Sequence, residues 1–124
     1  MPKVEVLLYK DEDGTVPLVE WFGIIRPTAR ARILARLKRL EELGHELRRP
    51  EADLLRDGVY ELRVKDERLH YRLLYFFHGT KAVVVSHGFV KNEARVPEKE
   101  IERALRRKRN IERNPLKYTF RPGA

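Results

Sequence analysis

The sequence contains no cysteine in its 124 residues, which excludes disulfide bonds and zinc sites that use thiolate ligands. It also lacks any apolar run near the roughly 20 residues that a membrane-spanning helix needs. No positively charged stretch followed by an apolar segment resembles a secretory leader. We therefore expect one domain, residues 1–124, that works in the cytoplasm without a membrane.

Motifs for several classes of chemistry are missing as well. The seven glycines are scattered, so they form neither a phosphate-binding loop nor a dinucleotide-binding motif. The four histidines lack the close spacing of a helical zinc site, and the dipeptide Ser86-His87 is not a nucleophile with a positioned base. No carboxylates cluster on one predicted strand, as a metal-dependent nuclease would require. We therefore expect neither a metal ion nor another cofactor.

Positive charge is what the chain has in excess. Its 27 Lys and Arg residues outnumber 19 Asp and Glu residues, which gives a formal charge of +8 at pH 7. Residues 95–124 contain ten Lys and Arg against four Glu, so much of this charge lies near the C-terminus. Such a field favours nucleic-acid phosphates or an acidic protein as the partner, although an anionic membrane surface would also attract it.

Three extended segments within residues 57–92 form the centre of the predicted fold. In the first, apolar and charged residues alternate from Tyr60 to Lys65, which is the period-2 pattern of a strand with one buried face. The second, 71–77, is almost entirely aromatic or apolar and predicts a central strand. The third, 82–90, is rich in valine. Short polar breaks between the three predict an antiparallel meander.

Helical patterns precede and follow this meander. Apolar residues recur at helical spacing from Pro17 to Ile25 and again from Thr28 to Leu43, with Thr28 suited to cap the second helix. Pro97 opens a third helix, which has acidic residues in its first turn and basic residues towards its end. The remaining predicted segments are a first strand at 3–9, a loop at 45–56 and a flexible tail at 114–124.

Arg72 needs a chemical explanation because it lies in the most apolar predicted strand. A buried guanidinium requires an anionic partner. In an antiparallel pair, Arg72 would lie near Arg63 and Lys65, and three such cations repel one another unless they bind an anion such as an RNA phosphate. A salt bridge from Arg72 to Glu61 or Asp66 is the structural alternative.

Two further candidates end the last predicted strand. His87 and Lys91 bring an imidazole and an ammonium group to the same strand end. A packed core histidine and an ordinary solvated lysine are the structural alternatives, and sequence spacing does not show whether these side chains converge.

The same segments, in this order, resemble a known family. The stretches DGVYELRVKD, YRLLYFF and HGFVKN, followed by P-x-x-E-I-x-R-A, resemble the RelE/HigB toxins of bacterial type II toxin-antitoxin systems, in particular the phage-derived branch of the RelE/ParE superfamily. The resemblance covers nearly the whole chain. It implies an α+β fold in which a helical hairpin and a C-terminal helix pack on a small, mainly antiparallel sheet.

The resemblance also implies a function and a set of partners. Proteins of this family are metal-independent endoribonucleases that cleave mRNA, usually on the translating ribosome, until a cognate antitoxin sequesters them. We therefore expect mRNA, the ribosome and an antitoxin with a helix-turn-helix domain as partners, so that DNA is contacted only through the antitoxin. A gyrase poison like the related ParE toxins and a non-catalytic basic RNA-binding module are the alternatives.

By position, the resemblance implies that Arg63, Lys65, Arg72 and Lys91 bind the scissile phosphate and neighbouring RNA. The family often has a catalytic tyrosine in its C-terminal helix, and this chain has none there, so His87 or Lys91 becomes the candidate for proton transfer. Replacing Arg72 by alanine is expected to abolish toxicity and leave the fold intact. The predicted catalytic residues are Arg63, Arg72, His87 and Lys91, and the predicted RNA-binding residues are Lys65, Arg68, His70, Asn92 and Arg95.

Overall fold

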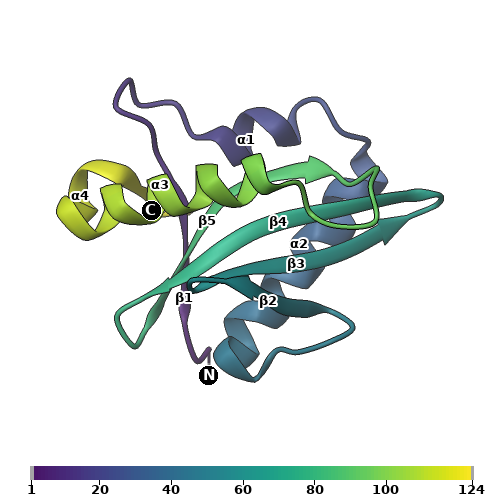
Figure 1. Cartoon of the computed structure of the whole chain (residues 1–124), viewed down its shortest axis with the longest axis horizontal. Helices are drawn as coiled ribbons and strands as arrows, with labels where there is room; N and C mark the ends of the chain where they lie inside the picture. The colour runs from purple at the N-terminus through teal and green to yellow at the C-terminus, as the bar shows by residue number, and fades with distance from the viewer. Residues whose placement is uncertain (1, 124) are drawn as a thin grey trace.

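The computed structural model describes residues 2–123 and has the α+β fold that the sequence predicts (Figure 1). In chain order the elements are β1 (Glu5–Tyr9), α1 (Pro17–Phe22), α2 (Pro27–Leu43), a 3-10 turn η1 (Gly44–Glu46), β2 (Ala52–Arg56), β3 (Val59–Asp66), β4 (Leu69–His78), β5 (Ala82–Val90), α3 (Glu98–Arg113), α4 (Pro115–Tyr118) and β6 (Thr119–Phe120). No helix in this part of the chain is long and apolar enough to cross a membrane.

The strands form one mixed sheet in the order β2-β3-β4-β5-β1-β6. β1 is parallel to β5, and the other neighbouring strands are antiparallel. The predicted meander β3-β4-β5 is therefore confirmed, and β4 is a central strand with Arg72 in it. β1, the predicted first strand, extends the sheet beside β5.

Helices cover both faces of the sheet, so the fold has three layers. The hairpin of α1 and α2 covers one face, where Ile33 and Leu40 pack with Leu62 and Leu73. Helix α3 crosses the other face (Figure 1), where Ile101 and other apolar residues of α3 pack on Val59 and Leu74. The alternation in β3 follows directly from this arrangement, because successive side chains of a strand point to opposite faces.

The start of α2 differs from the prediction. Pro27 occupies the first helical turn and Arg26 is the N-cap residue, so Thr28 does not cap the helix. The Thr28 hydroxyl instead donates a hydrogen bond to Asp66 Oδ2 over 2.9 Å, which ties α2 to the end of β3. The end of α2 agrees with the prediction: Gly44 has a φ of 56°, and its backbone N–H bonds to Leu40 O.

Residues 45–56, predicted to be a loop, contain the edge strand β2. Ala52 pairs with Leu62 of β3 and is fully buried, whereas Leu54 is 52% exposed. Leu54 and Leu55 are adjacent and do not alternate with polar residues, so β2 lacks the period-2 pattern of a half-buried strand. The segment at 114–120 contains α4 and the short strand β6, which pairs with β1.

A bulge in β5 decides which residues face α3. Leu74 pairs with His87 and Tyr75 pairs with Val85, so Ser86 has no partner across the ladder. An extra residue of this kind shifts the inward-outward alternation by one. As a result, His87 lies on the α3 face, and Gly88 lies under Trp21 on the opposite face, where a Cβ atom would come within 2.2 Å of the indole ring.

Candidate functional site

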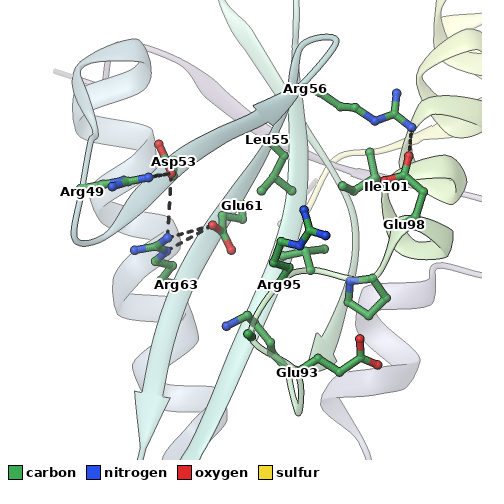
Figure 2. A pocket seen from close by; sticks show the side chains of 14 residues that line it. Arg49, Asp53, Leu55, Arg56, Glu61, Arg63, Glu93, Arg95, Glu98 and Ile101 are labelled. Carbon is green, nitrogen blue, oxygen red and sulfur yellow. Dashed lines mark hydrogen bonds and ion pairs between the residues drawn. The ribbon is translucent and has the colours of Figure 1, made fainter.

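A charged pocket of about 550 Å³ lies between the β2-β3 hairpin, the segment after β5 and the first turn of α3 (Figure 2). Its side chains come from segments far apart in the sequence, which the β2-β3 hairpin and the β5-α3 connection bring together. The cations that line it are Arg49, Arg56, Arg63, Lys91 and Arg95, and the acids are Asp53, Glu61, Glu93 and Glu98.

The pocket cations differ in whether they already have an anionic partner. Three of them pair with carboxylates of the pocket: Arg49 with Asp53, Arg56 with Glu98, and Arg63 with Glu61. Lys91 and Arg95 form no ion pair within residues 2–123. A phosphate that entered the pocket could therefore bind these two cations without displacing a carboxylate.

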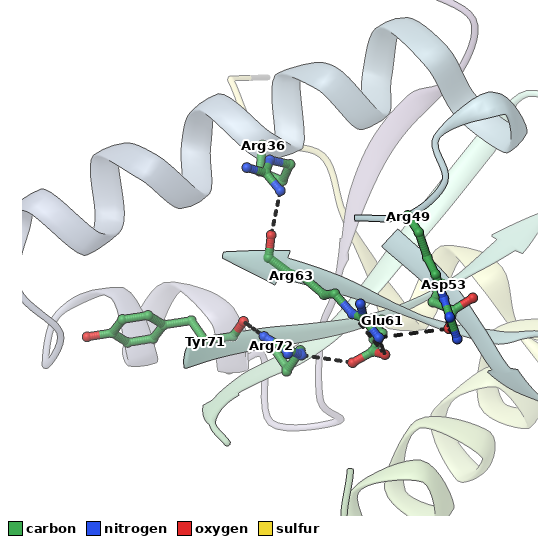
Figure 3. A network of polar contacts seen from close by, with 7 residues as sticks. All are labelled: Arg36, Arg49, Asp53, Glu61, Arg63, Tyr71 and Arg72. Carbon is green, nitrogen blue, oxygen red and sulfur yellow. Dashed lines mark hydrogen bonds and ion pairs between the residues drawn. The ribbon is translucent and has the colours of Figure 1, made fainter. Parts of the chain in front are cut away.

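Glu61 lies between two arginines on the sheet (Figure 3). Arg63 and Arg72 are direct cross-strand partners, and like charges in such positions repel. Glu61 Oε1 accepts a hydrogen bond from Arg72 Nε over 2.9 Å, and Glu61 Oε2 accepts one from Arg63 Nη2 over 3.1 Å. One buried carboxylate thus bridges two guanidinium groups and offsets one of their two positive charges. Of the two explanations for Arg72, the salt bridge to Glu61 is present.

Arg72 is the inner arginine of this network. Its side chain is 9% exposed, and its Nη1 group also donates to Tyr71 O over 3.0 Å. Burial lowers the pKa of the Arg72 guanidinium, and the Glu61 carboxylate opposes that shift. Arg72 is therefore fixed below the pocket, whereas the Arg63 side chain is 31% exposed and reaches the pocket wall.

Asp66, the other partner considered for Arg72, has a different role. Its carboxylate accepts hydrogen bonds or ion pairs from Arg26, Arg32 and Thr28, all near the start of α2. The carboxylate is almost fully buried, so these three donors satisfy it. Asp66 therefore anchors the helical hairpin to the sheet and does not contribute to the pocket.

His87 lies outside the pocket, in a buried network under α3. Its Nε2 atom is 2.9 Å from Glu100 Oε1, and its Nδ1 atom is 2.8 Å from Ser86 Oγ. Burial lowers the pKa of His87 to about 4, although its hydrogen bond to Glu100 opposes this shift. Neutral His87 then donates from Nε2 to Glu100 and accepts from the Ser86 hydroxyl, while Arg107 donates to Ser86 O over 3.0 Å. This network fastens α3 to the bulge in β5.

The other predicted RNA-binding residues lie around the site in several places. Lys65 borders a separate hollow beside α2, and Arg68 lies in the exposed turn between β3 and β4. His70 pairs with Lys65 across the ladder, and Asn92 is exposed next to Lys91. The structure thus brings Arg63, Lys91 and Arg95 together in one pocket, with Arg72 beneath it, and separates His87 and Lys65 from them.

Several residues of the pocket and of the His87 network were not predicted from the sequence. Arg49, Asp53 and Arg56 belong to the segment predicted as a loop, and Glu100 is the partner of His87. The dipeptide Asp57-Gly58, which joins β2 to β3 with both residues at positive φ, is a recognised hairpin signal and could have indicated a strand before it.

The comparisons with known proteins place this pocket within a family. Residues 20–109 match the model of a family described as phage derived protein Gp49-like (DUF891). The chain belongs to this family. The Gp49-like family is toxin-like and of the RelE/ParE type, which is consistent with a toxin of a toxin-antitoxin system. No curated protein matches the chain.

The Gp49-like match spans α1 to most of α3 and so includes both buried networks and the whole pocket. The elements β1, α4 and β6 lie outside the matched residues. Within residues 2–123, no group of three or more His, Asp or Glu side chains is arranged to hold a metal ion. That the protein acts without a metal ion remains a prediction.

Proposed function

We propose that this Gp49-like protein is the toxin of a type II toxin-antitoxin system and stops translation by cleaving mRNA in the cytoplasm. The observation that carries the proposal is the pocket in which Lys91 and Arg95, free of carboxylate partners among the described residues, lie with Arg63. Arginine forks and lysine ammonium groups are the usual ligands of phosphate. The positive charge of the chain and the toxin-like family support the same substrate.

The proposed reaction is an attack of the 2′-hydroxyl on the adjacent phosphate. The 2′-oxygen forms a bond to phosphorus, and the bond to the 5′-oxygen breaks, which leaves a 2′,3′-cyclic phosphate and a 5′-hydroxyl. Arg63 and Arg95 stabilise the negative charge that develops on the phosphate oxygens. Lys91 donates a proton to the departing 5′-oxygen. The predicted proton-transfer role of His87 stays a prediction, but its burial outside the pocket favours Lys91 for this step.

A ribosome would provide what the pocket lacks. Cations hold a phosphate but do not align a flexible single strand for in-line attack, and such alignment lowers barriers by roughly 7 to 11 kcal/mol. The outer side of α3 offers a surface for ribosomal RNA, because several of its cations are exposed and form no ion pair in the described part of the chain. These cations are Lys99, Arg106, Arg109 and Arg113.

An antitoxin is the second proposed partner. The net charge of +8 favours an acidic protein, and a helix-turn-helix antitoxin, which would link the toxin indirectly to DNA, is the expected type. A small gene for such a protein next to the gene of this chain would support this part of the proposal. Harmless expression of the chain alone would contradict it.

A gyrase poison is the alternative, and one feature of the pocket favours it. Arg49, Arg56, Arg63 and Arg72 are all paired with carboxylates, so an RNA phosphate must compete with Asp53, Glu61 and Glu98 for them. A site whose charges are mostly balanced suits a protein surface as well as a phosphate. This alternative predicts toxicity without RNA cleavage.

One experiment separates the two functions. The chain is expressed in bacteria beside a Lys91→Gln variant, transcript 5′ ends are mapped, and purified protein is added to a gyrase supercoiling assay. We expect new ends within translated frames for the wild type only, together with normal supercoiling. Inhibited supercoiling with intact transcripts would establish the gyrase poison instead.

The ribosome and metal requirements are tested with the same proteins in vitro. Programmed ribosomes should support cleavage of an mRNA that is not cut when it is free. A phosphorothioate at the scissile link should slow the reaction equally in Mg²⁺ and Mn²⁺. Rescue by Mn²⁺ would instead point to a catalytic metal bound to that oxygen.

A further inference from the structure

The proposed reaction needs a group that removes the proton from the 2′-hydroxyl. Arginines cannot accept a proton at neutral pH, and Lys91 is assigned to the opposite transfer. His87 is buried under α3 with both ring nitrogens occupied. The remaining candidates are the four carboxylates that line the pocket.

Three of these carboxylates are poorly suited to the task. Asp53 accepts hydrogen bonds from Nε and Nη2 of Arg49, over 2.9 and 2.7 Å. These bonds lower the pKa of Asp53. Glu98 is exposed and pairs with Arg56 at the rim. Glu93 is exposed on the segment after β5 and has no ion-pair partner that would orient it among residues 2–123.

Glu61 differs because its two oxygens are held by arginines of unequal freedom. Oε1 is bonded to Arg72, which is buried and fixed by a second bond to Tyr71 O. Oε2 is bonded to Arg63, whose side chain is partly exposed and also lies 3.9 Å from Asp53. A phosphate in the pocket would therefore draw Arg63 away more readily than Arg72.

We propose that Glu61 is the general base of this site and that substrate binding activates it. This inference rests on the proposed nuclease function. When the scissile phosphate takes the guanidinium of Arg63, Oε2 loses its donor and becomes free to accept a proton, while Arg72 still holds Oε1. Oε2 then takes the proton of the 2′-hydroxyl as the bond from the 2′-oxygen to phosphorus forms. The bond to the 5′-oxygen breaks, and that oxygen receives its proton from Lys91.

This arrangement explains why a base is held between two cations. In the free protein both oxygens are bonded, so Glu61 bridges the cross-strand arginines and is inactive as a base. The substrate phosphate replaces one carboxylate oxygen as the partner of Arg63, so each arginine then has an anion of its own: Arg72 has Glu61, and Arg63 has the phosphate. Activation is thus coupled to the presence of a phosphate in the pocket.

Glu61→Gln is the variant that tests the proposal, because it keeps the shape and the Oε1 acceptor for Arg72 but removes the base. Two quantities are measured on programmed ribosomes: the single-turnover cleavage rate, and the affinity for an mRNA with a 2′-deoxy nucleotide at the cleavage position. We expect the rate to fall by about 100-fold or more, which is the usual contribution of a general base. We expect the affinity to stay the same or increase, because Arg63 is no longer neutralised. Glu20→Gln, at an exposed carboxylate of α1 outside the pocket, is the matched control and should change the rate by less than about threefold.

A role as counterion alone predicts a different result. In that case Glu61→Gln would also bind RNA more tightly, but it would cleave as fast as the wild type, and this outcome would overturn the proposal. Glu61→Asp guards against a folding defect, because it retains a carboxylate. If Asp and Gln lose cleavage equally and are equally unstable, Glu61 is structural and the proposal is wrong.

Failure of the nuclease function itself looks different from either result. If the wild-type protein cuts no mRNA on ribosomes and the Lys91→Gln variant is as toxic as the wild type, both the nuclease function and the role of Glu61 as its base are wrong. If the wild type and Glu61→Gln cut mRNA equally well, only the proposed role of Glu61 is wrong, and the nuclease function stands.

Discussion

Two buried polar networks lie on the same face of the sheet and differ in their access to the pocket. Glu61 and His87 both pair with Leu74, one from each neighbouring strand, so the fully buried Leu74 separates the Glu61 network from the His87-Glu100 network. Two strand spacings place their backbones roughly 10 Å apart. The Glu61 network borders the pocket through Arg63, whereas His87 is covered by α3, which supplies Glu100.

The difference shows that residue type alone does not define a reactive site. Ser86, His87 and Glu100 form a chain of hydrogen bonds that resembles a catalytic triad, but Ser86 is fully buried and does not line the charged pocket. Glu61 and its arginines look like an ordinary salt bridge, yet one arginine is accessible. The Glu61 network has one member that a ligand can reach, and the His87-Glu100 network is covered by α3. Three predictions test this difference.

The largest expected effect is on stability, and it comes from Arg72→Ala. Glu61 would remain buried with Arg63 as its only cation, and breaking a buried pair from one side costs about 3 to 5 kcal/mol. The free energy of unfolding, measured in urea, should fall by this amount. The structure thus changes the expectation that this variant keeps its fold, so its loss of toxicity would not by itself show a catalytic role.

A double variant provides the control for this prediction. Arg72→Met combined with Glu61→Gln removes both charges and should recover part of the lost stability, because no charge is then buried without its partner. A loss below about 1 kcal/mol in Arg72→Ala would mean that water reaches Glu61 and that the network is more open than the structure indicates.

The second effect is a pH dependence that belongs to the covered network. The pKa of His87 is lowered from 6.5 to about 4 by burial, so the unfolded chain binds a proton between these values and the folded protein does not. This contribution to stability is fully present above pH 6.5 and is lost as the pH falls towards 4. The loss is on the order of 3 kcal/mol.

Urea unfolding of the wild type and of His87→Gln across pH 4 to 7 measures this contribution, because carboxylates elsewhere titrate equally in both proteins. The difference in unfolding free energy between them should shrink as the pH falls. A difference that grows at low pH would show that His87 is protonated in the fold and forms a charged pair with Glu100.

The fold could be predicted largely from local patterns, and the exception has a physical reason. Alternation in β3, the apolar run of β4 and the helical spacing of apolar residues in α1 and α2 each reflect burial or backbone geometry that a short segment determines. β2 was missed because Leu54 and Leu55 are adjacent and do not alternate with polar residues. Its hairpin turn, Asp57-Gly58, was the available sign.

The site could be predicted only in part, because it depends on register and on one irregularity. The meander was enough to place Arg72 beside Arg63. It was not enough for His87, because strict alternation along β5 would put His87 on the same face as Val83 and Val85, towards α1 and α2. The bulge at Ser86 turns it towards α3, and the sequence gives no clear signal for that bulge.

The smallest expected effect compares the outer arginine of each network. Arg63 contacts Glu61 and is 31% exposed, and Arg103 contacts Glu100 and is 43% exposed, so charge and exposure are similar. Only Arg63 borders the pocket. A short single-stranded RNA should therefore contact Arg63 and not Arg103.

Salt dependence of binding measures this contact, because each neutralised phosphate releases counterions. Losing one phosphate contact to a single strand lowers the slope of log affinity against log salt by about 0.7. We expect this decrease for Arg63→Ala with a short RNA and no change for Arg103→Ala. With whole ribosomes, Arg103→Ala should also lower the slope, because the outer side of α3 would then contact ribosomal RNA. If Arg103→Ala lowers the slope for the short RNA as much as Arg63→Ala does, the strand crosses α3, and the pocket is not the feature that selects it.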